Sequence, residues 1–87
     1  SRARALAGVL ADLAATHQVI VVTHLAQVAV MADKHYVVSK EPGDVPQTHL
    51  DEVTGEARTA EIARMLSGDQ SEASLAHAKQ MLAEARA

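Results

Sequence analysis

The sequence contains no cysteine, tryptophan or phenylalanine, and Tyr36 is its only aromatic residue. Without cysteine the chain can form no disulfide, no thiolate nucleophile and no cysteine-based zinc site. Apolar residues make up 48% of the chain, but many of them are alanines, so we expect a thin core. A domain of 87 residues buries only about 60% of the surface of its unfolded chain, which predicts marginal stability.

The chain also lacks a large excess of positive or negative residues. Its formal net charge is −3, and acidic and basic residues are mixed along the sequence. No basic stripe of the kind that binds phosphate backbones is present, so direct DNA binding by this segment is not expected. The apolar run at residues 19–22 is too short to span a bilayer, and no signal-peptide layout precedes it. We therefore expect a soluble, cytoplasmic protein without membrane contact, and the abrupt start in helical sequence suggests a truncated chain.

The first half of the chain predicts a helix followed by a β-α-β unit. Leucine and valine residues at helical spacing predict a helix over residues 2–15. The continuous β-branched run at 19–22 is typical of a strand covered on both faces in a parallel sheet. A helix over 25–32 and a second strand over 35–39 complete the unit, whose crossover should be right-handed if the strands are parallel.

The second half predicts a sheet edge and two helices. A turn at 41–44 and a modest strand at 48–53 suggest an edge hairpin. Thr59 can cap a helix that Gly68 ends, and Ser71 can cap the last helix. The fold class is therefore α/β, a single partial domain over 1–87 with three parts: helix and β-α-β unit at 1–39, loop and edge strand at 40–58, and helical tail at 59–87.

His24 is the most informative residue for chemistry. It directly follows the predicted interior strand and precedes a helix, which in an open α/β sheet is the crevice where ligands bind. An imidazole there can donate a hydrogen bond to a phosphate oxygen or to an attacking water, and the helix N-terminus adds amide donors. Its position alone slightly favours a structural role, in which Thr23 or His24 caps the helix, over a functional one.

No other pattern in the chain predicts a complete catalytic or ligand site. No two histidines have the spacing of a His-Glu-x-x-His motif, so we expect no metal site. No serine lies in a nucleophile elbow, and neither a phosphate-binding loop nor a dinucleotide fingerprint is present, so no cofactor-binding residue is assigned. The remaining histidines are expected to be structural or at the surface: His17, His35, His49 and His77.

Three stretches, taken in order, resemble the RecN family of ABC-type, SMC-like ATPases in bacterial DNA repair. They are QVIVVTHLAQVAVMAD at 18–33, EIARMLSG at 61–68 and LAHAKQML at 75–82. The first is similar to the segment around the switch histidine, and the other two look like the C-terminal end of the family. One departure is Ala26, where the family commonly has proline, which puts local rigidity in doubt.

The resemblance implies that the chain is the C-terminal part of a P-loop ATPase head and that His24 is the switch histidine, which senses the γ-phosphate and positions water. It also implies that ATP and Mg²⁺ act in the full-length protein. The phosphate-binding loop, signature motif and acidic strand would lie upstream of Ser1, so hydrolysis and cofactor binding by the segment alone are not expected.

Implied partners are the rest of the head, a second head in a homodimer, and DNA through the full-length protein. Implied roles are double-strand-break repair, recombination and the SOS response, with localisation at the nucleoid. The alternative is a free-standing, non-enzymatic α/β module that uses its helical tail to bind a partner protein.

Overall fold

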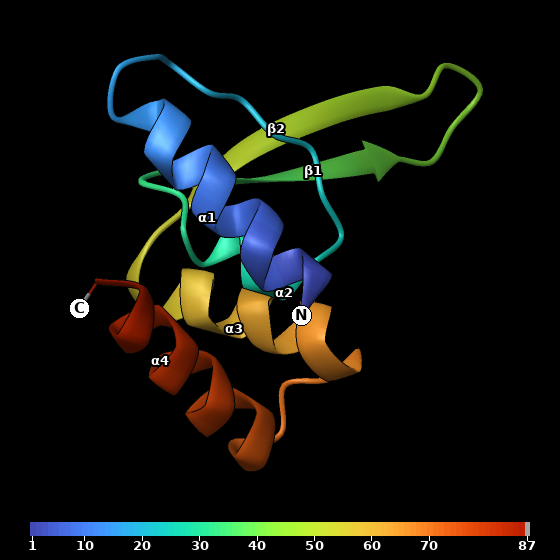
Figure 1. Cartoon of the computed structure of the whole chain (residues 1–87). Helices are drawn as coiled ribbons and strands as arrows, with labels where there is room; N and C mark the ends of the chain where they lie inside the picture. Colours follow the sequence, from blue (N-terminus) through green and yellow to red (C-terminus); the bar gives the residue numbers. More distant parts are fainter. Residues whose placement is uncertain (87) are drawn as a thin grey trace.

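The computed structural model describes residues 1–86 and combines helices with one small sheet (Figure 1). The predicted mixture of α and β structure is confirmed. In chain order the elements are α1 (Arg2–Ala14), α2 (Ala26–Ala29), β1 (His35–Glu41), β2 (Gln47–Val53), α3 (Gly55–Ser67) and α4 (Glu72–Arg86). None of these helices is both long enough and apolar enough to cross a membrane.

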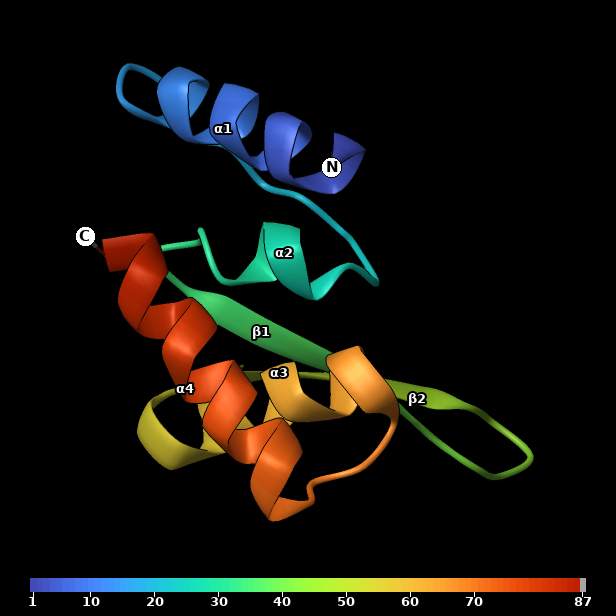
Figure 2. The same cartoon turned by 60° about the horizontal axis from the view of Figure 1, so that its bottom comes forward.

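Helix α1 forms as predicted, but its apolar stripe is largely uncovered. The Ser1 hydroxyl caps it by accepting a hydrogen bond from the Arg4 amide at 3.2 Å. Only Ala7 is buried, whereas Leu6, Val9 and Leu13 are between 46% and 64% exposed. In Figure 2 the helix lies apart from α3 and α4, on the far side of α2. The apolar side of α1 is therefore only partly covered by other residues in the described part of the chain.

The predicted strand at 19–22 is wrong for this structure. These residues form the irregular connection between α1 and α2, and Ile20 and Val22 are 85% and 94% exposed. A strand exists only where a neighbour accepts and donates its backbone hydrogen bonds, and no other strand pairs with this segment in residues 1–86. The β-α-β unit is consequently absent, and β1 has no parallel neighbour.

The predicted hairpin is confirmed and is longer than expected, but it forms the whole sheet of residues 1–86 rather than the edge of a larger one. Strands β1 and β2 pair antiparallel in a register that runs from His35 opposite Val53 to Glu41 opposite Gln47. The intervening residues include Pro42, Gly43 and Pro46, which favour a turn over continued pairing. The tip of the hairpin extends away from the helices (Figure 1), and only the end near His35 and Val53 reaches the helical layer.

Helix α3 begins earlier than predicted. It starts at Gly55, after Thr54, so Thr59 is not its cap but a buried residue inside the helix. The Thr59 hydroxyl donates to the Gly55 carbonyl at 3.3 Å, a back-bond that satisfies a polar group on a buried face. The predicted end is confirmed, because Gly68 has φ of 79° in the left-handed C-cap position, where a side chain would be strained.

A small polar network fixes the turn from α3 to α4. The Ser71 hydroxyl accepts from the Ser74 amide at 3.3 Å, so the predicted role of Ser71 as a cap is confirmed. Asp69 accepts from the Ser71 amide and from the hydroxyls of Ser67 and Ser74. These bonds, the Ser71 amide first, lower the pKa of the Asp69 carboxyl.

The core lies between α2, α3 and α4, and it is thin as predicted. Its fully buried members include Ile62, Ala63 and Ala78, and the only large one among them is Ile62. The apolar stripes predicted on the last two helices pack here, so the tail surface that a partner-binding module would need is covered. The radius of gyration is 13.9 Å, against about 12 Å for a well-packed chain of this length, which reflects the projecting hairpin and the loosely attached α1.

Candidate functional site

His24 lies in a bend between the exposed segment 19–22 and α2, and its side chain is exposed. No side chain caps α2: its first residue is Ala26, and its N-cap residue is Leu25. The Thr23 hydroxyl instead accepts from the Leu25 amide at 3.0 Å, which folds the bend that presents His24. The capping role considered for His24 is therefore wrong, and within residues 1–86 no hydrogen bond engages its imidazole.

The helix after His24 is shorter than predicted. Helix α2 contains four residues, where the sequence predicted a helix over 25–32. A macrodipole sums over aligned peptide units, so a single turn contributes only a small positive potential at its start. The imidazole, rather than the helix N-terminus, is accordingly the main donor that this bend offers to an anion.

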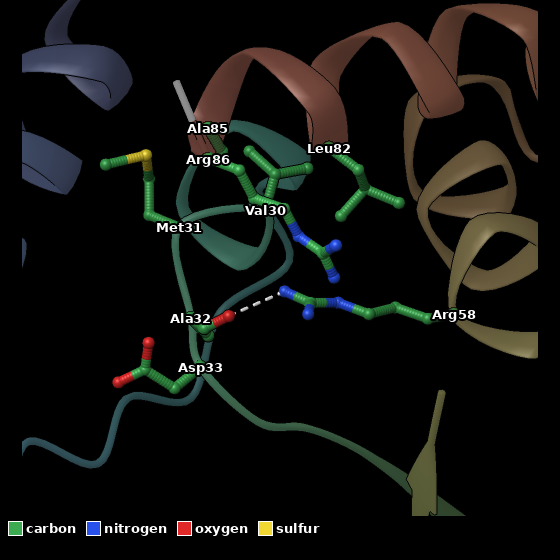
Figure 3. Close-up of a pocket in the computed structure, with 8 residues that line it drawn as sticks. All are labelled: Val30, Met31, Ala32, Asp33, Arg58, Leu82, Ala85 and Arg86. Carbon is green, nitrogen blue, oxygen red and sulfur yellow. Dashed lines mark hydrogen bonds between the residues drawn. The ribbon is translucent and has the colours of Figure 1, made fainter. Parts of the chain in front are cut away.

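Arg58 of α3 fastens the end of α2 and was not singled out by the sequence analysis. One terminal nitrogen of its guanidinium, Nη2, donates to the carbonyl of Ala32 at 2.7 Å (Figure 3) and to the carbonyl of Ala29 at 3.2 Å. The Ala29 carbonyl ends α2 and also accepts from the Ala32 amide at 3.2 Å, whereas Ala32 lies in the connection after the helix, so Arg58 joins both the helix end and this connection to α3. A signal was present, since Arg58 precedes the buried Ile62 by four residues and therefore lies on the core-facing side of α3.

We expect Arg58→Ala to lower the free energy of unfolding of the 87-residue chain by about 1.5–3 kcal/mol, because charge-assisted bonds to two carbonyls are lost. Arg64→Ala is the matched control on the same helix. Arg64 is exposed and bonds Glu61 one turn away, a contact that stabilises a helix by about 0.2–0.5 kcal/mol. Urea unfolding measures both, and equal losses would contradict the anchoring role of Arg58.

His35, at the start of β1, is held in a partly buried position near α3. Its Nδ1 atom is buried without a hydrogen-bond partner in the described structure. Burial lowers the pKa of His35 below its ordinary value of 6.5; the charge of Arg58 lowers it further, and Glu61 acts in the opposite direction. The structure thus favours the neutral ring.

Acidification should destabilise the chain through His35. Well above pH 6.5 the ring is neutral in both the folded and the unfolded state, so its ionisation has no effect on stability there. Below pH 6.5 the unfolded state takes up the proton first, so stability falls as pH drops toward the lower folded pKa. We expect His35→Gln to reduce the loss of stability between about pH 7 and pH 5. Ordinary carboxyl groups titrate below this range, so they contribute little to the pH dependence there.

The measurement is urea unfolding at a series of pH values, with His77→Gln as the control. His77 is an exposed histidine on α4, so its replacement removes an imidazole without touching the strand end. A pH dependence of stability that His35→Gln leaves unchanged would refute the role of His35.

The other histidines lie on separate elements. Nδ1 of His17 is 2.8 Å from the Thr16 hydroxyl at the end of α1, and Nε2 of His49 is 3.0 Å from the Glu41 carboxylate across the hairpin. Within residues 1–86 the structure brings together no group of three side chains from His, Cys, Asp and Glu that could hold a metal ion. His24 therefore stands alone as a candidate, in a bend anchored indirectly through α2 and Arg58.

Comparison with curated proteins gives close relatives, while no protein-family model matches the chain. It is 52% identical over 80 residues to a protein of Deinococcus radiodurans, 48% identical over 82 to one of Treponema pallidum, and 50% identical over 78 to one of Mycobacterium leprae. These matches cover 91%, 92% and 88% of this chain, but the chain spans only about one seventh of the relatives' length, 14%, 14% and 13%.

All three relatives are DNA repair proteins, so the chain is similar to that class over nearly its whole length. Each is RecN, and the matched part is a C-terminal segment of it. The resemblance to the RecN family predicted from the sequence is thereby confirmed.

Proposed function

We propose that this segment is the C-terminal part of the ATP-hydrolysing head of a RecN-type protein that acts in DNA double-strand-break repair and recombination. The observation that carries the proposal is the 46–52% identity, over about nine-tenths of the chain, to four proteins named DNA repair protein RecN. In this role the full-length protein hydrolyses ATP with Mg²⁺, works as a pair of heads in the bacterial cytoplasm, and contacts DNA outside this segment.

His24 is proposed as the residue of this segment that acts on the nucleotide. Its imidazole is exposed and has no hydrogen-bond partner in the described structure, so both ring nitrogens can take one. A neutral or protonated imidazole donates well to a phosphate oxygen and can orient a water through its second nitrogen. These properties fit contact with the terminal phosphate, where a donor aimed at developing negative charge stabilises the transition state.

The exposed segment 19–22 supports the same proposal. In the full-length protein it would be an interior strand of the head sheet, with its backbone paired on both edges. The 85% exposure of Ile20 and the 94% exposure of Val22 leave a β-branched run in water, which a neighbouring sheet would bury. His24 would then lie at the carboxyl end of that strand, where ligands of open sheets bind.

ATP supplies the phosphoryl group to be cleaved, and Mg²⁺ supplies charge neutralisation on its oxygens. The 87 residues include no Gly-x-x-x-x-Gly-Lys-Ser/Thr loop, so the chain's own contribution is His24, held at the start of α2. Arg58, by tying the end of α2 to α3, limits how far that bend can move. The segment thus supplies one donor of the site and the scaffold that positions it.

The test is made in a full-length RecN-type protein that carries this segment, by measuring ATP turnover and ATP affinity separately for the parent protein and for His24→Ala. A selective loss of turnover supports the proposed role, because it identifies a group used in the transition state rather than in binding.

A further inference from the structure

Two arginines from different helices face one hollow beside the end of α2. Figure 3 shows the guanidinium of Arg58, from α3, next to that of Arg86, from the last turn of α4. The hollow has a volume of about 360 Å³, at the lower end of the range of small-molecule sites. Several residues with apolar side chains also line it, although the surface exposed to the hollow is mainly polar; the remaining lining residues are Val30, Met31, Ala32, Asp33, Leu82 and Ala85.

Within residues 1–86, no side-chain carboxylate forms an ion pair with either arginine. The ion pairs present in residues 1–86 join His49 to Glu41 and Arg64 to Glu61, and neither involves the hollow. Asp33 lines the hollow, but Figure 3 shows its carboxylate turned away from both guanidiniums. The two positive charges therefore lie close together without an opposite charge between them.

The same pair borders a second hollow of about 390 Å³, on the side of α4 that faces the start of α3. That hollow adds Lys79 and Glu56, so the two hollows together present three cations and two carboxylates. Counted over the side chains that line the two hollows, the charge is positive, although the chain carries a net charge of −3. Burial, followed by the charge of Arg86, lowers the pKa of Arg58, and the opposite effect of Asp33 is weaker than either.

The arginines also have unused donors. A guanidinium carries five N–H groups, and Arg58 spends those of Nη2 on the carbonyls of Ala29 and Ala32. Its Nε is buried without a partner, and the described structure gives the guanidinium of Arg86 no hydrogen bond. Two neighbouring guanidiniums with free N–H groups can donate several hydrogen bonds to one anion. Planar carboxylates and tetrahedral phosphates both fit this arrangement of donors.

We propose that the hollow between Arg58 and Arg86 binds an oxyanion, namely the phosphate or carboxylate group of a small molecule. The anion accepts hydrogen bonds from Arg86 and from the unused terminal nitrogen of Arg58, and it removes the repulsion between the two guanidiniums. Leu82 and Ala85 border the hollow and accommodate an apolar portion of the same ligand. The site shares Arg58 with the scaffold proposed to hold the bend, but it does not include His24, so anion binding and ATP turnover can be tested separately.

The experiment titrates the 87-residue chain with inorganic phosphate and, separately, with acetate, at constant ionic strength and neutral pH, while amide chemical shifts are recorded by NMR. We expect saturable shifts at residues 31–33, 58 and 82–86 with one of the two anions. Arg86→Gln should weaken that binding about tenfold, the effect of losing roughly 1.4 kcal/mol of a charge-assisted contact. Arg86 is exposed in the last turn of α4, so its replacement leaves the core intact.

Arg2→Gln is the matched control, because it removes the same charge from an exposed position on α1. Saturation by phosphate alone identifies phosphate as the ligand group, and saturation by acetate alone identifies carboxylate; either result supports the site. Failure of both anions to saturate these residues, or equal weakening by Arg2→Gln and Arg86→Gln, would overturn it.

Discussion

Replacing His24 by alanine in the full-length protein is expected to lower the ATP turnover rate by about 10²–10³-fold, the effect of removing one preorganised donor from a charge-developing transition state. The dissociation constant for ATP should change only a few-fold, because in the proposed function residues other than His24 hold the nucleotide. Turnover is measured as phosphate release at saturating ATP, and affinity by equilibrium binding of a slowly hydrolysed analogue.

His77→Ala is the control for this substitution, since it removes an exposed histidine from α4, away from the bend. It should leave both turnover and affinity within experimental error of the parent protein. Unchanged turnover in His24→Ala would contradict the assignment, and parallel loss of turnover and affinity would mean that His24 binds the ground state.

The largest expected effect on stability comes from Ile62. Its side chain is 0% exposed and fills the space between α2, α3 and α4, in a core otherwise built largely from alanine and valine. Ile62→Ala removes buried methyl and methylene groups and leaves a cavity that small neighbours cannot fill. We expect the free energy of unfolding to fall by about 2–5 kcal/mol, and Ile62→Val, which keeps the branched shape, to lower it by about 0.5–1.5 kcal/mol.

Ile20→Ala is the matched control, because it makes the same chemical change at a side chain that is 85% exposed. In the 87-residue chain its effect on unfolding in urea should lie within about 0.5 kcal/mol of zero. In the full-length protein, where we propose that residues 19–22 form an interior strand, the same substitution should become strongly destabilising. A loss for Ile62→Ala no larger than that for Ile20→Ala in the 87-residue chain would contradict the described core.

The sequence predicted correctly those features that depend on residues close together in the chain, namely the hairpin, the end of α3 and the cap of α4. The hairpin follows from two β-rich stretches separated by a segment with two prolines and a glycine, and its strands pair with each other. Gly68 ends α3 and Ser71 caps α4 because a left-handed residue and a side-chain acceptor each act within one turn of the chain. The apolar stripes of α3 and α4 pack against each other and against α2, as their helical spacing predicted.

The features that depend on distant partners were not predictable in the same way. A strand at 19–22 requires neighbours that residues 1–86 do not provide, so its β-branched composition is not sufficient to form one. Thr59 has the residue type of a cap, yet Thr54 and Gly55 begin the helix earlier and bury it. Arg58 bonds carbonyls 26 and 29 positions away in the sequence, a contact that no local pattern specifies.

The candidate site was also predictable only in part. The sequence placed His24 after an apolar run and before a helix, and the structure keeps that order but removes the capping role and shortens the helix to one turn. The role of His24 in ATP hydrolysis stays a prediction based on the family resemblance. The contact between Arg58 and the end of α2 is new from the structure, and it explains what holds the bend in place.

The most direct test of the central claim is a crystal structure of the full-length protein with Mg²⁺ and a non-hydrolysable ATP analogue. Our account predicts that residues 19–22 pair on both edges within the head sheet. It also predicts that a ring nitrogen of His24 lies within hydrogen-bonding distance, about 2.7–3.2 Å, of a terminal phosphate oxygen or of a water bound to it. A structure in which residues 19–22 remain unpaired and His24 faces solvent away from the nucleotide would contradict the account.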